Sequence, residues 1–335
     1  MAGIAAVGRA DATISPVKRI LVRHIGDFEI SECEIPEPGP GEVLLKVGVT
    51  GVCRTDLKII RVGHRDLVLP RVPGEEVVGV VHAVGPGVSG VPLGGRYYVY
   101  PGIWCGKCPA CLKGAENLCR EMKIMGFHRD GGFADYVLAP VASLTPIPEG
   151  LPDDRAIFTE PLSCCLNALE LGRVSEGKSV GIWGGGPAGT LLNRAAQALG
   201  AETCVIEPDA RRRALIDGYE VPPRSDFDVC IVAVGSPAAY AQALSHLAPR
   251  GVLVVFSGLP PEEVSVSLNQ LHYLEQTLVG AYGCSYRHGL QALDSIASGR
   301  VRVDDMVSHR LPLTELGRAL EIVQAREGMK ILLIP

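Results

Sequence analysis

Four cysteines within fifteen residues constrain this chain more than any other feature. They are Cys105, Cys108, Cys111 and Cys119, in a segment rich in glycine and proline. Tight turns can bring four thiolates at this spacing around one tetrahedral Zn²⁺ ion, and such a closed shell stabilises a segment that has little hydrophobic core of its own. Buried cysteines without a metal would not need such close spacing. The sequence therefore predicts a structural zinc lobe at about residues 101–120.

A second constraint is a glycine-rich turn between an apolar strand and a helix. It consists of Gly184, Gly185, Gly186, Pro187, Ala188 and Gly189. In such a turn the first glycine reverses the chain, the second admits a pyrophosphate to backbone N–H groups, and the third allows the helix to pack closely on the strand. The hexamer alone is a weak signal. Its position, after the apolar run 179–183 and before a helical pattern that continues to 199, predicts a dinucleotide-binding βαβ unit.

The next strand ends in an acid, which bears on the choice of dinucleotide. Glu207 lies about twenty residues beyond the turn, where a carboxylate accepts hydrogen bonds from the adenosine ribose and repels a 2′-phosphate. This position favours NAD over NADP. Two alternatives remain: Glu207 could be only an exposed acid at a strand end, and the run 211–213, three arginines, could reach a phosphate. We include Arg212 among the candidate cofactor-binding residues.

Composition and charge argue against several classes of partner. The 335 residues exceed the usual size of one hydrophobic core, so two domains are expected. A net charge of -5 without a basic stripe argues against nucleic acid and anionic membranes as partners. No stretch approaches the length of a membrane span, and the N-terminus has no signal-peptide pattern, so we expect a cytoplasmic protein. Eleven cysteines in such a protein favour metal binding or catalysis over disulfides.

Two further segments complete a resemblance to a known family. Residues 51–56 read Gly-Val-Cys-Arg-Thr-Asp and residues 160–163 read Glu-Pro-Leu-Ser. With the cysteine lobe and the glycine-rich turn, and in this order, the chain resembles the medium-chain dehydrogenase/reductase family in its zinc-containing alcohol and polyol dehydrogenase branch. The resemblance covers nearly the whole chain. The Glu-Pro-Leu element is similar to that of the sorbitol, threonine and glucose dehydrogenases.

This resemblance implies roles for individual residues. Cys53 would be a thiolate ligand of a catalytic zinc, Thr55 the hydrogen-bond partner of the substrate oxygen, and Asp56 an outer support of the metal site. Glu160 would be a ligand or a water-bridged neighbour of the metal. The implied chemistry is hydride transfer from a zinc-activated alcohol to a nicotinamide ring. Without the pattern, Cys53 could equally be an ordinary buried cysteine and Thr55 a turn residue.

One departure from the family concerns the metal site. Where the family reads Gly-His-Glu, residues 74–76 read Gly-Glu-Glu, so the expected histidine ligand is missing. Glu76 matches the family's glutamate. Three alternatives follow: Glu75 binds the metal itself, His64 from the preceding loop replaces the histidine, or the catalytic metal is lost and only the structural zinc remains. A shell containing Glu75 would carry one more negative charge, which would lower the Lewis acidity of the metal and shift activity toward alkaline pH.

A second departure concerns the edge of the nucleotide-binding sheet. The helical segment 209–217 is followed almost at once by the strand 227–231, where the family usually has another strand and helix. We therefore expect a sheet that is trimmed at this edge, with 219–223 as a remnant. The cysteines that no motif claims lie in apolar runs and are expected to pack in the core: Cys33, Cys164, Cys165, Cys204, Cys230 and Cys284.

Together these features predict an α/β protein with two domains. A GroES-like β-barrel catalytic domain would comprise residues 1–155 and 286–335, and a Rossmann domain with a doubly wound parallel sheet would comprise 156–285. The active site would lie between them, at the carboxyl ends of the parallel strands. The expected function is hydride transfer between NAD and a secondary, polyol-like or cyclitol-like alcohol or its ketone, in a homodimer or homotetramer. Two alternatives remain: a metal-free reductase of a conjugated double bond, and a non-catalytic NAD-binding protein.

Overall fold

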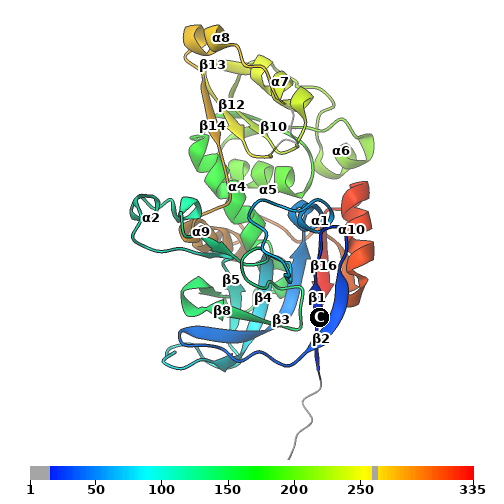
Figure 1. Ribbon diagram of the computed structural model, residues 1–335. Helices are drawn as coiled ribbons and strands as arrows, with labels where there is room; N and C mark the ends of the chain where they lie inside the picture. Colours follow the sequence, from blue (N-terminus) through cyan, green and yellow to red (C-terminus); the bar gives the residue numbers. More distant parts are fainter. Residues whose placement is uncertain (1–15, 259–262) are drawn as a thin grey trace, which may run out of the picture.

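The described residues form two large sheets, one above the other in the view of Figure 1, and two small two-stranded sheets. This computed structural model describes residues 16–258 and 263–335. The predicted domains also contain residues 1–15 and 259–262, which lie outside the described residues. The upper sheet is parallel and the lower one is mostly antiparallel, and the chain passes from the lower sheet to the upper one and back again.

The upper sheet has the predicted Rossmann arrangement. Its five parallel strands are, in spatial order, β11 (Glu202–Ile206), β10 (Ser179–Trp183), β12 (Phe227–Val232), β13 (Leu247–Val255) and β14 (Thr277–Gly280). The strand order reverses at β10, because β11 pairs with one side of this strand and β12 with the other. All five residues of β10 are buried, as expected for a strand that is covered on both faces.

Helices cover both faces of this sheet. Alternate residues of a strand point to opposite faces, and β12 shows this directly: Val229 and Ile231 pack with helices α4 and α5, whereas Cys230 and Val232 pack with α7. The helices of this region are α4 (Thr159–Leu171), α5 (Pro187–Ala198), α6 (Ala210–Ile216), α7 (Pro237–Ser245), α8 (Leu268–Leu274) and α9 (Tyr286–Ala297). The doubly wound architecture predicted from the sequence is confirmed.

The expected trimming of the sheet is also confirmed. Among the described residues, β11 is the outermost strand on its side, and only an isolated parallel bridge between Ile206 and Tyr219 extends the sheet further. Tyr219 is the first residue of the predicted remnant. Such a short edge leaves few unpaired backbone groups for association with another chain.

The lower sheet is built around one long strand. Its strands are, in spatial order, β15 (Val307–Pro312), β16 (Lys330–Ile334), β3 (Glu42–Val52), β4 (Glu76–Val84), β5 (Arg96–Val99) and β9 (Leu144–Pro146), and β8 (Tyr136–Pro140) also pairs with β3. Two small antiparallel sheets pair β1 (Val17–Leu21) with β2 (Glu29–Cys33), and β6 (Gly102–Ile103) with β7 (Lys123–Ile124). The remaining helices are α1 (Arg54–Arg61), α2 (Pro109–Leu112), α3 (Asp153–Ala156) and α10 (Leu316–Ala325), with 3₁₀ turns at Glu116–Leu118, Val141–Ser143 and Leu313–Glu315.

One hydrophobic cluster contains residues of both large sheets. Val49 and Tyr98 of the lower sheet, Leu162 of α4, Ile296 of α9 and Val254 of the upper sheet belong to the same buried cluster. The C-terminal segment returns to the lower sheet, where β16 pairs with β3, as the sequence predicted. Because α4 and α9 pack against both sheets, the domain boundaries at 155 and 286 stay a prediction.

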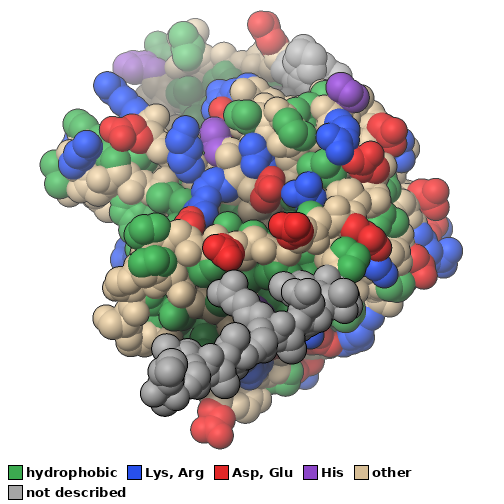
Figure 2. Space-filling view, turned by 60° about the horizontal axis from the view of Figure 1, so that its bottom comes forward, with side chains coloured by type: hydrophobic (Ala, Val, Ile, Leu, Met, Phe, Trp, Pro, Cys, Tyr) green, Lys and Arg blue, Asp and Glu red, His purple; other side chains and the backbone are tan. Residues whose placement is uncertain are grey.

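The surface carries charges of both signs. On the face shown in Figure 2, acidic and basic side chains are interspersed. Exposed ion pairs such as Arg23 with Glu29, at 2.8 Å, contribute only about 0–1 kcal/mol each. None of the helices in the described part of the chain is both long and apolar enough to cross a membrane.

Candidate functional site

The four predicted zinc-binding cysteines lie together at the tip of the lobe. The Sγ atoms of Cys105, Cys108, Cys111 and Cys119 all lie within 4.8 Å of one another. Backbone N–H groups point at the sulfurs: Cys108 N is 3.4 Å from Cys105 Sγ, and Cys105 N is 3.4 Å from Cys119 Sγ. Such N–H groups stabilise thiolates, and thiolates bound to one tetrahedral zinc would be roughly 3.8 Å apart. These residues therefore fit a structural Zn²⁺.

The lobe is attached to the loop that joins β14 to α9. Asn117 Nδ2 donates a hydrogen bond to Tyr282 O at 2.7 Å, and Glu116 Oε1 accepts one from Tyr286 N at 2.8 Å. Glu116 is buried, so its carboxylate depends on this bond. The conformation of the loop is thus tied to that of the zinc lobe.

The glycine-rich turn has the geometry that dinucleotide binding requires. Gly184 has a φ of +108°, which only glycine adopts readily, and a Cβ on Gly189 would lie 1.8 Å from Gly184 O. Gly186 precedes the first turn of α5 and has no side chain to cover the free N–H groups of the helix. The turn follows β10, where the strand order reverses. The residues present therefore fit a pyrophosphate.

Glu207 and Arg212 flank this turn. The carboxylate of Glu207 accepts hydrogen bonds from Gly185 N at 2.8 Å and Asp209 N at 3.0 Å. A Cβ on Gly186 would lie 2.9 Å from Nη1 of Arg212, so this guanidinium lies across the turn. Arg212 Nε also donates to Arg326 O at 2.8 Å. Sequence reasoning predicted Glu207 and Arg212 at this position but gave no indication of the contact with Arg326.

Cys53 lies where β3 ends and α1 begins. Its backbone N–H donates to Asp56 Oδ2 at 2.8 Å, which caps the first turn of the helix. Asp56 is buried, and its Oδ1 has no hydrogen-bond partner. Burial raises the pKa of Asp56 to about 7, although the hydrogen bonds with Cys53 oppose the shift. Thr55 lies in the same turn and is half-buried.

Glu76 forms a buried ion pair that the sequence did not reveal. Lys330 Nζ lies 2.6 Å and 2.7 Å from the two carboxylate oxygens of Glu76, and both side chains are 3% exposed. The carboxylate lies over Gly51, where a Cβ would be 1.9 Å from Glu76 Oε2. The only signal for this pair was a lysine at the start of an apolar terminal strand. Both carboxylate oxygens of Glu76 thus accept hydrogen bonds from Lys330.

The structure brings Glu160 next to two cysteines that the sequence analysis assigned to the core. Ligand atoms of Glu160, Cys164 and Cys284 all lie within 4.8 Å of one another, whereas those of Cys53, Glu75 and Glu160 do not. Cys164 Sγ is 3.4 Å from Glu160 Oε1. We call Glu160, Cys164 and Cys284 the interior cluster. The core-packing interpretation of Cys164 and Cys284 therefore misses a polar contact, because neither flanking sequence showed that these thiols meet a carboxylate.

Glu75 lies close to this cluster, and His64 does not join it. One carboxylate oxygen of Glu75 is buried without a hydrogen-bond partner. Burial and the charge on Glu160 raise the pKa of the Glu75 carboxyl well above its usual value. His64 instead contacts Phe127 edge-on, with ring centroids 5.1 Å apart, and lies 3.5 Å from Asp66.

Contacts join these residues to the glycine-rich turn. Cys165 Sγ, on α4 next to Cys164, lies 3.6 Å from Ala188 O in the turn. Arg54, next to Cys53, lies near enough to Arg326 and Arg212 for their charges to interact. Burial, followed by repulsion from these two arginines, lowers the pKa of Arg54. The predicted catalytic residues and the cofactor turn are therefore neighbours in space, although more than twenty residues separate them in the sequence.

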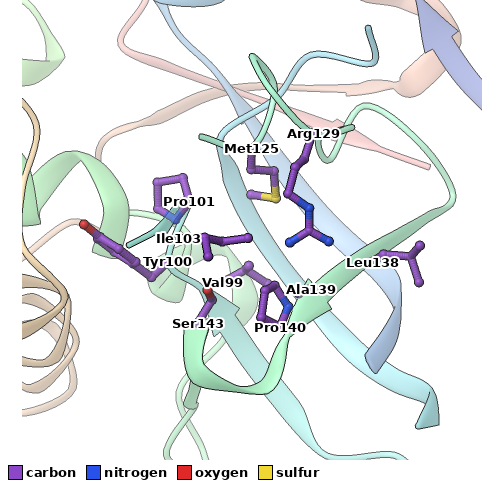
Figure 3. Close-up of a pocket in the computed structure, with 10 residues that line it drawn as sticks. All are labelled: Val99, Tyr100, Pro101, Ile103, Met125, Arg129, Leu138, Ala139, Pro140 and Ser143. Carbon is purple, nitrogen blue, oxygen red and sulfur yellow. The ribbon is translucent and has the colours of Figure 1, made fainter. Parts of the chain in front are cut away.

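A separate pocket beside the lower sheet is not lined by acidic residues or cysteines like those of the predicted site. Figure 3 shows it between the zinc lobe and β8, with Met125, Arg129, Pro140 and Ser143 among its lining residues. None of the predicted site residues lines it. The guanidinium group of Arg129, one of the lining residues, forms an ion pair with Glu42, in which Nη2 lies 2.5 Å from Oε1. We assign it no function.

Comparisons with known proteins agree with this geometry. Residues 39–149 match the alcohol dehydrogenase GroES-like domain, and residues 223–298 match the zinc-binding dehydrogenase model. The chain is 33% identical to an L-threonine 3-dehydrogenase of Pyrococcus abyssi, over 90% of this chain and 94% of the relative. It is 30% identical to L-galactonate-5-dehydrogenase of Escherichia coli K12, over 89% and 93% of the two chains.

Solved structures show the same fold. A zinc-binding dehydrogenase of Sinorhizobium meliloti 1021 bound to NADP is 31% identical and has a TM-score of 0.88, covering 96% of this chain and 100% of that one. RspB of Escherichia coli CFT073, complexed with NADH, is 25% identical with a TM-score of 0.89 over the same shares. The predicted fold class and family are confirmed: this chain belongs to the zinc-containing medium-chain alcohol and polyol dehydrogenases.

Proposed function

We propose that this protein oxidises a secondary alcohol on a small polar molecule, with NAD as hydride acceptor. The observation that carries the proposal is the contact between α4 and the glycine-rich turn. This helix bears Glu160, and Cys165 on the same helix reaches Ala188 of the turn at 3.6 Å. A dinucleotide bound on the turn would therefore lie beside the buried acids and thiols. When bound there, zinc supplies a Lewis acid and the nicotinamide ring accepts the hydride.

The chain's own residues would position the substrate and balance charge. Thr55 is half-buried in the first turn of α1, where its hydroxyl can exchange a hydrogen bond with a substrate oxygen. Asp56 accepts a hydrogen bond from the backbone N–H of Cys53 and so fixes the turn that carries this thiol, which the family resemblance predicts to be a metal ligand. Lys330 neutralises Glu76, whereas Asp56, Glu75 and Glu160 form no ion pair with a basic side chain of the described residues.

The substrate class that we propose rests on the names of the relatives. The names of the related enzymes place their reactions at position 3 of threonine and at position 5 of galactonate. Both positions carry a secondary hydroxyl in a small, polar, acid-bearing molecule. We propose the same class, amino alcohols and sugar-derived alcohols, for this chain. The cytoplasmic location and the homodimer or homotetramer stay predictions.

Turnover with a panel of secondary alcohols tests this function. NADH formation would be followed for amino alcohols, sugar acids and cyclitols, and NADH consumption for the corresponding ketones and for conjugated enones. We expect turnover in the first two groups and loss of it in Thr55→Val with NADH binding unchanged. Turnover of enones alone would support the metal-free reductase, and NADH binding without any turnover would support the non-catalytic protein.

The preference for NAD is proposed from Glu207. Its carboxylate is held beside the turn by two backbone N–H groups and keeps lone pairs that can accept from ribose hydroxyls. The wild type should bind NADH more tightly than NADPH, and Glu207→Gln should reduce this preference by about tenfold. Fluorescence titration with both dinucleotides measures the ratio. Tighter binding of NADPH by the wild type would contradict the proposal and assign Arg212 to the 2′-phosphate.

A further inference from the structure

Two members of the interior cluster lie one turn apart on a helix. Glu160 and Cys164 are four residues apart on α4, so both side chains project from the same face. Cys164 Sγ and Glu160 Oε1 are 3.4 Å apart. A thiolate and a carboxylate oxygen that bind one tetrahedral zinc ion would be separated by roughly 3.5 Å. The helix thus holds these two donors at a metal-binding spacing without any rearrangement of the backbone.

The third member is brought in by a loop that several contacts hold in place. Tyr100 Oη donates to Cys284 O at 2.7 Å, Ser163 Oγ donates to Cys284 Sγ at 2.9 Å, and Asn167 Nδ2 donates to Gly283 O at 2.9 Å. Two of these donors are on α4 itself. The position of Cys284 relative to Cys164 is therefore fixed, and its sulfur receives a hydrogen bond of the kind that supports a thiolate.

Polar atoms around the cluster lack partners. The hydroxyl of Tyr98, a fully buried residue, makes no hydrogen bond, and burial, with the nearby charges of Cys284 and Glu160, raises the pKa of this hydroxyl. One oxygen of Glu75 is also buried without a partner. Lys330, the nearby cation, is taken up by Glu76. Burying polar atoms without partners is costly, and a divalent cation beside the cluster would offset the negative charge of its carboxylates.

From this arrangement we propose that Glu160, Cys164 and Cys284 bind the interior zinc ion of this chain, with Glu75 as the adjacent acid. Three protein ligands leave a coordination position open, which distinguishes catalytic from structural zinc sites. The assignment deepens the proposed function by naming the ligands, and it replaces Cys53 as the source of the thiolate. It also accounts for the loss of the family's histidine, since two cysteines next to Glu160 complete the ligand set.

Zinc content per chain tests this assignment without any alcohol substrate. Full-length protein would be loaded with zinc, dialysed and analysed by mass spectrometry of the metal. We expect Cys164→Ser and Cys284→Ser each to lose about one equivalent of zinc relative to the wild type. Cys165→Ser is the matched control, because Cys165 is the next residue on the same buried helix but contacts Ala188, and it should lose none. Cys53→Ser should also retain its zinc.

Loss of zinc from Cys53→Ser together with full retention in Cys164→Ser would overturn the proposal. So would a wild type that binds only the lobe zinc. Failure of the dehydrogenase function is a separate outcome, because the zinc content can be as expected while no alcohol is oxidised.

A measurement on the wild type covers the case in which a serine variant does not fold. X-ray absorption of the zinc-loaded protein gives the mean number of sulfur ligands, and chelation of the more labile metal then isolates the interior contribution. We expect two sulfurs at the interior zinc. A single sulfur there would favour Cys53 with Glu75 and Glu160, and would overturn the assignment.

Discussion

The zinc lobe and the interior cluster both gather cysteines, but they are built in opposite ways. The lobe takes four ligands from fifteen consecutive residues and turns backbone N–H groups toward their sulfurs. The interior cluster takes its ligands from a helix and from a distant loop, and it combines one carboxylate with two thiols. The lobe can therefore form from local sequence alone, whereas the interior cluster exists only after both sheets have packed together.

The largest effect is expected from removing a ligand of the lobe. Structural zinc binds small domains with on the order of 10 kcal/mol, so the Cys119→Ser variant should lose the lobe zinc and unfold residues 101–124. Hydrogen exchange would show at least about tenfold faster exchange in this segment. Because Asn117 and Glu116 hold the loop at 282–286, protection of that loop should fall as well.

The control for this prediction is Cys33→Ser, since Cys33 belongs to neither cluster. This variant should leave the exchange of both segments unchanged. If the loop stays protected after the lobe has unfolded, the two clusters are independent, and the contacts of Asn117 and Glu116 do not couple them.

The second largest effect is expected from removing Lys330, the buried cation that balances the charge of Glu76. Removing one partner of a buried ion pair leaves an uncompensated charge, so Lys330→Met should lower the free energy of unfolding by about 3–5 kcal/mol. The double variant Lys330→Met with Glu76→Gln should lose less than the sum of the two single variants. Denaturant unfolding measures all three proteins.

Lys178→Met is the matched control for this pair. Lys178 pairs with Asp228 at 3.2 Å, but both side chains are 40% or more exposed, so its loss should cost about 1 kcal/mol or less. If Lys178→Met and Lys330→Met lowered the free energy of unfolding by similar amounts, burial would not increase the contribution of an ion pair to stability.

The same contrast explains what could be predicted from the sequence. The lobe, the glycine-rich turn and the strands of the Rossmann unit follow from short patterns, because their hydrogen bonds or ligands are close in the chain. The trimmed sheet edge was predictable for the same reason. Contacts such as Lys330 with Glu76, 254 residues apart, and Ser163 with Cys284, 121 residues apart, leave no local signature.

Helix α4 illustrates the same limit. It carries the predicted catalytic residue Glu160, and its sequence shows no clear apolar stripe. α4 is buried on several sides between the two sheets, so its polar and apolar residues do not separate into two faces. Glu160 could be found by its family motif, but its neighbours Cys164 and Cys284 could not, because the pairing depends on how the loop after β14 folds back.

A smaller effect is expected where the interior cluster meets the cofactor turn. A Cβ on Gly189 would lie 1.8 Å from Gly184 O, so Gly189→Ala must shift α5 away from the turn. We expect at least about tenfold weaker NADH binding, or 1.4 kcal/mol. The zinc content of both sites should be unchanged, because neither set of ligands is on α5.

Gly280→Ala is the control for this change. Gly280 ends a strand of the same sheet, and no atom lies within 4 Å of the position of its Cβ. NADH titration of the two variants separates a local clash from a general loss of stability. Loss of zinc from Gly189→Ala would show that the metal site depends on α5 more than the contacts indicate.

The smallest effect is expected at the contact that joins the end of α4 to the start of α9. Arg287 Nη2 lies 3.0 Å and 2.9 Å from the carboxylate oxygens of Glu170, and His288 Nε2 lies 3.2 Å from one of them. Partial burial raises the pKa of Glu170, but these hydrogen bonds outweigh it, so the pKa is lowered. The stabilisation is therefore present above the unfolded-state pKa and is lost as the pH falls through the folded-state pKa.

Glu170→Gln should accordingly cost less than about 1 kcal/mol near neutral pH, because the side chain is more than half exposed, and nothing in acid. Urea unfolding at the two pH values measures the difference, with Glu176→Gln, an exposed acid, as the control. The zinc content should not change, since Ser163 and Asn167 hold the Cys284 loop closer to the cluster. Loss of the interior zinc from Glu170→Gln would instead mean that this surface contact positions Cys284, and that the interior cluster depends on a single exposed carboxylate.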